Sequence, residues 1–161
     1  MPADELKRII EERFNGVQER IDGGAIEEIV EVAECHPYYT QYLCHILYDI
    51  MEQRRIRAED SPLAMDFLLQ SEATAYMNTW DLLTQRQRHA LIILSETAPG
   101  ENPLRAEALK RFKMSRPAVM VRALKSLIDK DLVDKADGRY EIIEFFFKRW
   151  VRRYIPQSQP L

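Results

Sequence analysis

The feature that most constrains this sequence is an Asp-Gly pair near its C-terminal end. Asp137-Gly138 lies between two short runs, residues 132–135 and 139–143, whose composition favours extended backbone. Asp-Gly between such runs, here in the connection Ala136-Asp137-Gly138, is typical of a β-hairpin turn. The elements that pack against this hairpin then decide the fold class.

Helical patterns surround the predicted hairpin. One helix is capped by Thr84 and ends before Pro99-Gly100, and a short helix covers residues 105–112. A longer helix is predicted to be capped by Ser115, with Pro117 in its first turn, and a closing helix follows the hairpin. Helix, helix, turn, helix, hairpin is the order of a winged helix-turn-helix.

The first half of the chain is predicted to be entirely helical. Its segments cover residues 3–15, 25–34, 37–51 and 61–80, with Ser61-Pro62 as an N-cap followed by a first-turn proline. The third helix carries a broad apolar stripe predicted for burial, which includes Tyr42. The predicted fold is therefore mainly α: a helical lid-like domain (1–83), a winged helix domain with a small β-hairpin (84–155) and a flexible tail (156–161).

Charge divides the chain in the same place. Residues 1–83 hold 7 Lys and Arg against 17 Asp and Glu, a net charge of −10, whereas residues 84–161 hold 16 against 9, a net charge of +7. This change of sign indicates two modules, and the second suits a polyanion or an acidic protein face.

Composition and missing motifs exclude several classes. No apolar run approaches the roughly 20 residues that cross a bilayer, the first residues lack the apolar centre of a secretory signal, and two cysteines build no disulfide framework. We therefore expect a cytoplasmic protein without a membrane partner. The sequence has no GxxxxGK[ST], GxGxxG, HExxH, CxxC or GxSxG motif, so we expect no enzymatic activity from this chain.

Three runs carry a family resemblance. They are Glu12-Arg13-Phe14, the run from Ala33 through His36-Pro37-Tyr38-Tyr39 to Leu43, and the closing run from Glu144 to Trp150. Together they resemble the C-terminal portion of archaeal-type STAND/AAA+ P-loop ATPases, in which a nucleotide-binding domain precedes a helical lid and a winged helix. Two positions depart from that pattern: Cys35 stands where the family has glycine, and Glu144-Phe145 replaces Asp-Pro.

The resemblance implies a partner domain that these residues do not contain. The P-loop core is missing, so the chain is expected to be either a truncated protein or a stand-alone descendant, with no hydrolytic machinery of its own. ATP and magnesium are implied for the full-length parent, which would be an ATPase, and no cofactor is expected on this chain alone.

The nucleotide side of the resemblance concerns one helix start. Free N–H groups at a helix N-terminus favour an anion, and the resemblance would place His36, Pro37 and Tyr38 near nucleotide held by the missing core. Alternatively, Pro37 only starts a helix and the tyrosines fill an interface. A zinc site of Cys35, His36, Cys44 and His45 is not predicted, because neighbouring helical side chains diverge.

A second candidate site is the basic face of the winged helix. The helix after Ser115 is expected to point Arg116, Met120, Arg122 and Lys125 outward, and the wing offers Lys135 and Arg139. Such a helix would enter the major groove while the wing follows a phosphate strand. Further backbone contacts could come from Arg105, Lys110, Arg111 and Lys113.

The same helix lacks the residue types that usually read bases. It has no Asn or Gln, and Met120 and Val121 are apolar, so a protein-docking role stays open. Lys148, Arg149, Arg152 and Arg153 on the closing helix could suggest a membrane surface, but the favoured interpretation is that they form the solvated side of a helix whose aromatic residues close the core.

These observations favour one function and leave two alternatives. The favoured function is the lid and winged-helix regulatory half of a P-loop ATPase, which closes over nucleotide and couples that closure to a DNA or protein partner. The alternatives are a free-standing winged-helix DNA-binding regulator and an interaction module that binds neither nucleotide nor DNA.

Overall fold

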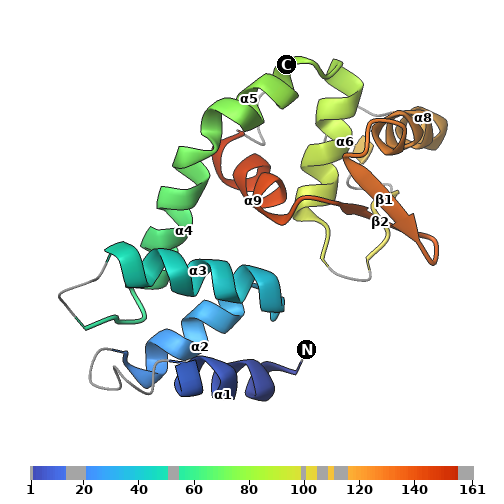
Figure 1. Ribbon diagram of the computed structural model, residues 1–161. Coiled ribbons are helices and arrows are strands. Elements are labelled where there is room, and N and C mark those ends of the chain that lie inside the picture. Colours follow the sequence, from blue (N-terminus) through green and yellow to red (C-terminus); the bar gives the residue numbers. More distant parts are fainter. Residues whose placement is uncertain are drawn as a thin grey trace. The chain divides into compact units, whose positions relative to one another are not determined.

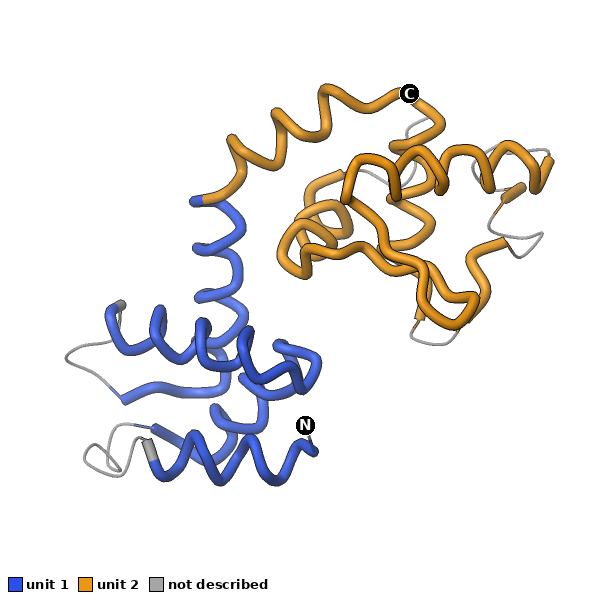
Figure 2. The backbone as a smooth tube through the Cα atoms, turned by 45° about the vertical axis from the view of Figure 1, so that its right-hand side comes forward, with its two compact units in different colours: residues 1–71 blue, residues 72–161 orange. Residues whose placement is uncertain are grey.

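The computed structural model describes residues 2–13, 21–50, 55–98, 101–104, 109–110 and 116–155. The chain forms two compact units, Met1–Ser71 and Glu72–Leu161 (Figures 1 and 2). Described helices predominate, and one two-stranded antiparallel sheet lies near the C-terminal end. Among the described residues, no helix combines the length and the apolar character that a membrane span needs.

Unit 1 consists of helices α1 (Ala3–Arg13), α2 (Gly23–Val32), α3 (Pro37–Ile50) and α4 (Asp60–Ser71). Helix α2 packs against the other three, and α3 also packs against α4. A single parallel bridge joins Ile21 to Ile56, with the N–H of Asp22 donating to the carbonyl of Ile56 at 3.0 Å. The fully buried side chains at the centre of the unit are Ile29, Leu43, Leu47, Leu68 and Leu69.

Helix α2 begins and ends with local hydrogen bonds. The Asp22 carboxylate caps its start by accepting from the N–H of Gly24 at 2.9 Å. At the other end, the N–H of Cys35 donates to the carbonyl of Val30 and the N–H of Glu34 donates to that of Glu31, each at 2.9 Å. These two bonds form a Schellman motif, which ends the helix at Val32.

The segment predicted as one helix over residues 61–80 is two helices. Helix α4 ends at Ser71 and α5 covers Ala73–Asp81, with Glu72 between them. The Ser61 cap was also wrong: α4 begins one residue earlier at Asp60, so Ser61 lies buried in the first turn. The Asp60 carboxylate accepts from the N–H of Arg57 at 2.8 Å and stabilises this start.

Unit 2 continues from α5 with α6 (Gln85–Glu96), α8 (Pro117–Ile128), strands β1 (Val133–Ala136) and β2 (Arg139–Ile142), and α9 (Phe145–Tyr154). Helix α6 is its central element, since it packs against α8, α9 and β2. Residues 90–95 of α6 are all buried. Of the short helix predicted over residues 105–112, the structure describes 109–110 as helical; the predicted tail, 156–161, lies outside the described residues.

The hairpin prediction is confirmed. Strands β1 and β2 pair in antiparallel register from Val133 opposite Ile142 to Ala136 opposite Arg139. Asp137 and Gly138 alone connect them, with φ values of +52° and +76°. Positive φ at both positions is the type I′ geometry that matches strand twist, and it explains why Asp-Gly stands here.

The mainly helical fold with a small wing is as predicted, but the compact units divide earlier than the expected boundary at residue 83. Helix α5 lies in unit 2 because its aromatic side chains contact α9: the ring centroid of Tyr76 is 5.4 Å from that of Phe147, and that of Trp80 is 6.3 Å from that of Trp150. Counted over the observed units, residues 1–71 have 7 Lys and Arg against 15 Asp and Glu, and residues 72–161 have 16 against 11.

Candidate functional site

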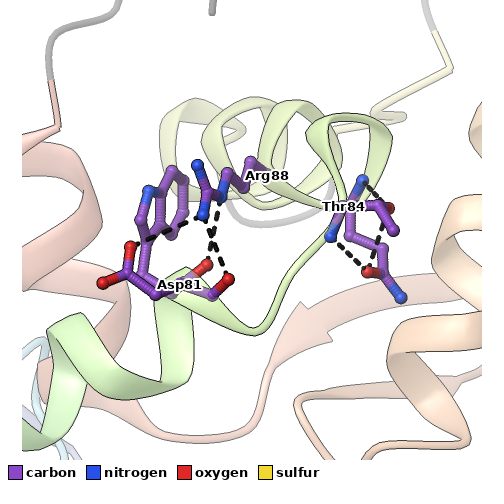
Figure 3. A network of polar contacts seen from close by, with 5 residues as sticks. Asp81, Thr84 and Arg88 are labelled. Atoms are coloured by element: carbon purple, nitrogen blue, oxygen red, sulfur yellow. Dashed lines mark hydrogen bonds and ion pairs between the residues drawn. The ribbon is translucent and has the colours of Figure 1, made fainter.

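Polar contacts at the junction between α5 and α6 hold the start of α6, the central helix of unit 2. Arg88 of α6 reaches back to α5, where its Nε donates to the Trp80 carbonyl at 3.0 Å and its Nη2 lies 3.5 Å from the Asp81 carboxylate (Figure 3). Thr84 and Gln87 form a capping box at the start of α6, in which the N–H of Thr84 donates to Oε1 of Gln87 at 2.8 Å.

Gln87 also connects α6 to α8. Its side chain is buried, and Nε2 donates to the hydroxyl of Ser126 at 2.9 Å. This bond links the first turn of α6 to the last turn of α8, and it satisfies the buried amide of Gln87. The buried side of α8 consists of Met120, Ala123, Leu124 and Leu127.

The buried side of α8 corrects one prediction. Met120 was expected to point outward, but its side chain is fully buried, whereas Val119 is only half-buried. The residue that points outward is Val121, whose exposed fraction is 42%. Helix spacing alone left this choice open because residues 119–121 are all apolar, and packing against α6 decides it.

The predicted cap of α8 was also wrong. Helix α8 begins at Pro117 and its N-cap is Arg116, which makes no side-chain capping bond. Proline fits the first helical position, since its missing N–H needs no partner there, and this fixes the cap at the residue before it. Arg116 is exposed, as are Ala118, Arg122 and Lys125. We call Ala118, Val121, Arg122 and Lys125 the α8 face; their spacing of three and four residues places them together.

The wing separates its two predicted cations. Side chains alternate between the faces of a strand, so Lys135 and Tyr140 share one face with Val133, whereas Arg139 lies on the other face. Lys135 Nζ lies 5.2 Å from the Tyr140 ring centroid, within cation–π distance. On the opposite face, Asp134 and Glu141 stand directly across from each other.

The cations of unit 2 are unevenly distributed. Residues 116–144 hold six Lys and Arg and six Asp and Glu, so α8 and the wing together have no net charge. Helix α9 has four cations and no carboxylate. Of the residues predicted to support phosphate contacts, Lys110 is exposed; Arg105, Arg111 and Lys113 lie outside the described residues.

The other candidate residues lie in unit 1, at the start of α3. His36, Pro37 and Tyr38 are all exposed, Tyr38 by 61%. The His36 ring centroid is 4.1 Å from that of Tyr39. The rings of Tyr38 and Tyr42 are parallel, 6.2 Å apart, so Tyr42 is an exposed partner of Tyr38 and not the buried residue that was predicted. Their separation of four residues was the sequence signal for this pair.

The turn before α3 has an unusual backbone. Glu34 and Cys35 have φ values of +51° and +57°, in the left-handed region that glycine enters freely. Cys35, which stands where the resembling family has glycine, therefore keeps a glycine-like conformation. Neither Cys35 nor Cys44 forms a disulfide, and within the described ranges no three His, Cys, Asp or Glu side chains gather closely enough to hold a metal ion.

The helix order, the hairpin and the exposed helix before it define residues 72–155 as a winged helix domain, a class that binds DNA or proteins. Residues 74–153 match the family model described as a probable winged helix domain. No curated protein and no solved structure matches the chain.

Glu144-Phe145 stands where the family that the chain resembles has Asp-Pro, yet Glu144 still caps the last helix. Glu144 is the N-cap of α9, and its carboxylate accepts from the N–H of Phe146 at 3.0 Å and from the N–H of Phe147. Glutamate thereby supplies the capping oxygen that aspartate commonly supplies at a helix start.

Proposed function

We propose that this chain is the lid and winged-helix half of a P-loop ATPase. It would close over nucleotide bound by a separate core domain and couple that closure to a partner of the winged helix. The resemblance of the His36-Pro37-Tyr38-Tyr39 run to the lid of STAND/AAA+ ATPases supports this function. A helical unit followed by a winged helix domain is also the order that such a lid requires.

The observation that carries the proposal is the exposed start of α3. Burial of Leu43 and Leu47 holds the inner face of the helix, while Tyr38 and Tyr42 present stacked rings outward. An aromatic pair left exposed beside helical N–H groups suits a ligand that has a planar ring and an anionic group, as ATP has.

Closure would work by differential contact. ATP and magnesium would be held by the core domain, and magnesium would neutralise phosphate charge there. His36, Pro37 and Tyr38 would touch nucleotide in only one arrangement of lid and core, so nucleotide would favour that arrangement by the free energy of those contacts. No hydrolytic role falls to residues of this chain.

Two exposed tyrosines of α3 provide a matched test. Tyr48 lies near the other end of the helix and is also exposed, so Tyr48→Ala removes the same group far from the helix start. In the protein translated from the complete reading frame, we expect Tyr38→Ala to weaken ATP binding about three- to tenfold and Tyr48→Ala to leave it unchanged. Equal effects, or a reading frame without a GxxxxGK[ST] loop, would contradict the proposal.

A free-standing DNA-binding regulator is the second candidate, supported by the exposed Arg122 and Lys125 of the α8 face. Duplex affinity measured at two salt concentrations tests it. A DNA reader should lose both affinity and salt dependence when Arg116, Arg122 and Lys125 are replaced by alanine.

A further inference from the structure

The α8 face combines an apolar centre with free cations. Ala118 and Val121 are exposed, and the exposed side chains of Arg122 and Lys125 lie one helical turn or less from them. Among the residues that the structure describes, no ion pair or hydrogen bond engages the side chains of Arg122 or Lys125. Both cations are therefore available to an incoming partner.

A DNA duplex fits this face poorly for reasons of charge. A duplex read by α8 also lies along the wing. The wing has three exposed carboxylates, Asp134, Asp137 and Glu141, against two cations, of which Lys135 stacks on Tyr140. Phosphates brought to this hairpin would meet net negative charge, which opposes the counterion release that drives duplex binding.

Base reading is equally weakly supported. The hydroxyl of Ser126 already accepts from Gln87, and α8 contains no Asn or Gln. The exposed Ala118 and Val121 offer no hydrogen-bond donor or acceptor from their side chains. Arg122 is the one side chain at the middle of the face that could read a guanine edge.

We propose that the α8 face docks an acidic, amphipathic helical segment of a protein partner. Carboxylates of that segment would pair with Arg122 and Lys125, and an apolar side chain would cover Val121 and Ala118. A helix about 10 Å across can occupy α8 without lying on the acidic wing, as a duplex cannot. The inference rests on the winged helix being the partner-binding unit of the proposed function, and it is independent of the nucleotide contacts of α3.

The test uses a fluorescein-labelled 15-residue helical peptide with one leucine stripe flanked by glutamates, and in parallel a labelled 20-base-pair duplex. Two matched peptides replace either all glutamates by glutamine or the leucines by serine. We expect the acidic amphipathic peptide to bind more tightly than either matched peptide and more tightly than the duplex at the same salt concentration. Amide resonances of residues 118–125 should shift on its addition.

Variants of the chain locate the binding. Arg122→Glu with Lys125→Glu should weaken the peptide at least about tenfold, and Val121→Ser should weaken it about threefold. Arg86→Glu with Arg152→Glu changes net charge by the same amount at exposed positions of α6 and α9 and should change affinity less than twofold. All these positions are exposed, and circular dichroism spectra confirm that each variant is folded.

Three results would overturn the inference: tighter binding of the duplex with dependence on Arg122 and Lys125, equal weakening by both charge reversals, or no binding of the acidic peptide at millimolar concentration. Loss of the effect of Tyr38→Ala on ATP affinity would instead count against the nucleotide role alone. The two failures are therefore distinguishable.

Discussion

Left-handed backbone occurs where helices α2 and α8 end. Beyond α8, the N–H of Leu132 donates to the carbonyl of Leu127 and that of Asp131 to Ile128, each at 3.0 Å, while Asp131 has a φ of +56°. This is the same Schellman arrangement that ends α2, and in both places the left-handed residue bears a side chain.

Asp131 and Asp129 form a natural pair for measuring the cost of that conformation. Asp129 is exposed with a φ of −61°, so Asp131→Gly should raise the free energy of unfolding by about 0.5–1 kcal/mol and Asp129→Gly should lower it by a similar amount. Both changes remove a carboxylate from the same helix end, so chemical denaturation of the two variants isolates the backbone effect. Shifts in the same direction would contradict it.

His89 on α6 gives unit 2 a dependence on pH. Partial burial penalises the imidazolium and lowers the pKa of His89 below its ordinary value of 6.5. The unfolded chain therefore takes up this proton first, and the free energy of unfolding should fall as pH drops below 6.5 toward the lowered pKa, with no contribution above 6.5.

Denaturation at pH 5, 6 and 8 tests the His89 contribution. His89→Gln should lose a measurable part of the decline toward acid, because glutamine does not titrate. Gln85→Ala, at an exposed position of the same helix that carries no titratable group, should keep the decline of the unaltered chain. An identical acid dependence for His89→Gln and the unaltered chain would show that burial of His89 is not its cause.

Outward residues were harder to predict than buried ones. The exposure of Val121 in place of Met120 depends on how α8 packs against α6, another helix of the same unit. Tyr42 was assigned to the core because apolar spacing does not show where neighbouring helices stop covering a face. Such assignments depend on tertiary packing.

At the scale of elements, two carboxylates repel each other across the wing. Asp134 and Glu141 are directly opposed on one face of the hairpin, and like charges in that position destabilise a strand pair. Glu141→Lys should raise the free energy of unfolding by about 0.2–1 kcal/mol by creating an opposite-charge pair. Glu141→Gln should give a smaller gain, and amide exchange across the hairpin should slow in the same order; no gain from either would contradict the repulsion.

The start of α9 depends on one side chain. Glu144 accepts from two backbone N–H groups, so Glu144→Ala should lower the free energy of unfolding by about 0.5–2 kcal/mol. Glu144→Asp should keep most of it, because a carboxylate still reaches the first turn. Thermal unfolding of unit 2 measures both, and equal losses would show that capping is not the stabilising contact.

Elements defined by local signals were predicted well. Pro117 fixes its own φ, and Asp-Gly readily adopts the positive φ values of a tight hairpin turn, so the first turn of α8 and the hairpin followed directly. The break between α4 and α5 carried no such signal, because Glu72 has nearly helical angles, with φ −91° and ψ −3°. The packing of Tyr76 and Trp80 against α9, together with the contacts of Arg88 with Trp80 and Asp81, holds α5 in unit 2.

At the scale of the whole molecule, the two tryptophans report on one unit. Trp80 and Trp150 are both buried in unit 2, whereas helicity belongs to both units. If the units unfold separately, Leu47→Ala in α3 should lower the free energy of unfolding of unit 1 by about 2–5 kcal/mol, the cost of a core cavity. The midpoint of part of the circular dichroism transition should then fall, and the fluorescence transition should stay where it was. Leu124→Ala should move fluorescence, and a shift of both signals by Leu47→Ala would show a single cooperative transition.

The charge pattern predicted two modules with a border after residue 83, whereas the two compact units meet after residue 71. Counting charge places Glu72 and Asp81 with the acidic half, whereas both residues belong to unit 2. The fold class could be predicted from the sequence because the spacing of apolar residues indicates the buried face of each helix. The docking role that we propose for α8 was not, since it depends on which cations stay unpaired once the chain has folded.

The partly exposed thiol of Cys35 lies one residue before His36, at the turn that leads into α3. With Cys44 replaced by serine, a maleimide would attach at this one place beside the proposed nucleotide face. Under the proposed function, alkylation of Cys35 would slow when nucleotide brings the proposed core domain over this turn, and mass spectrometry with and without ATP would measure that change in rate.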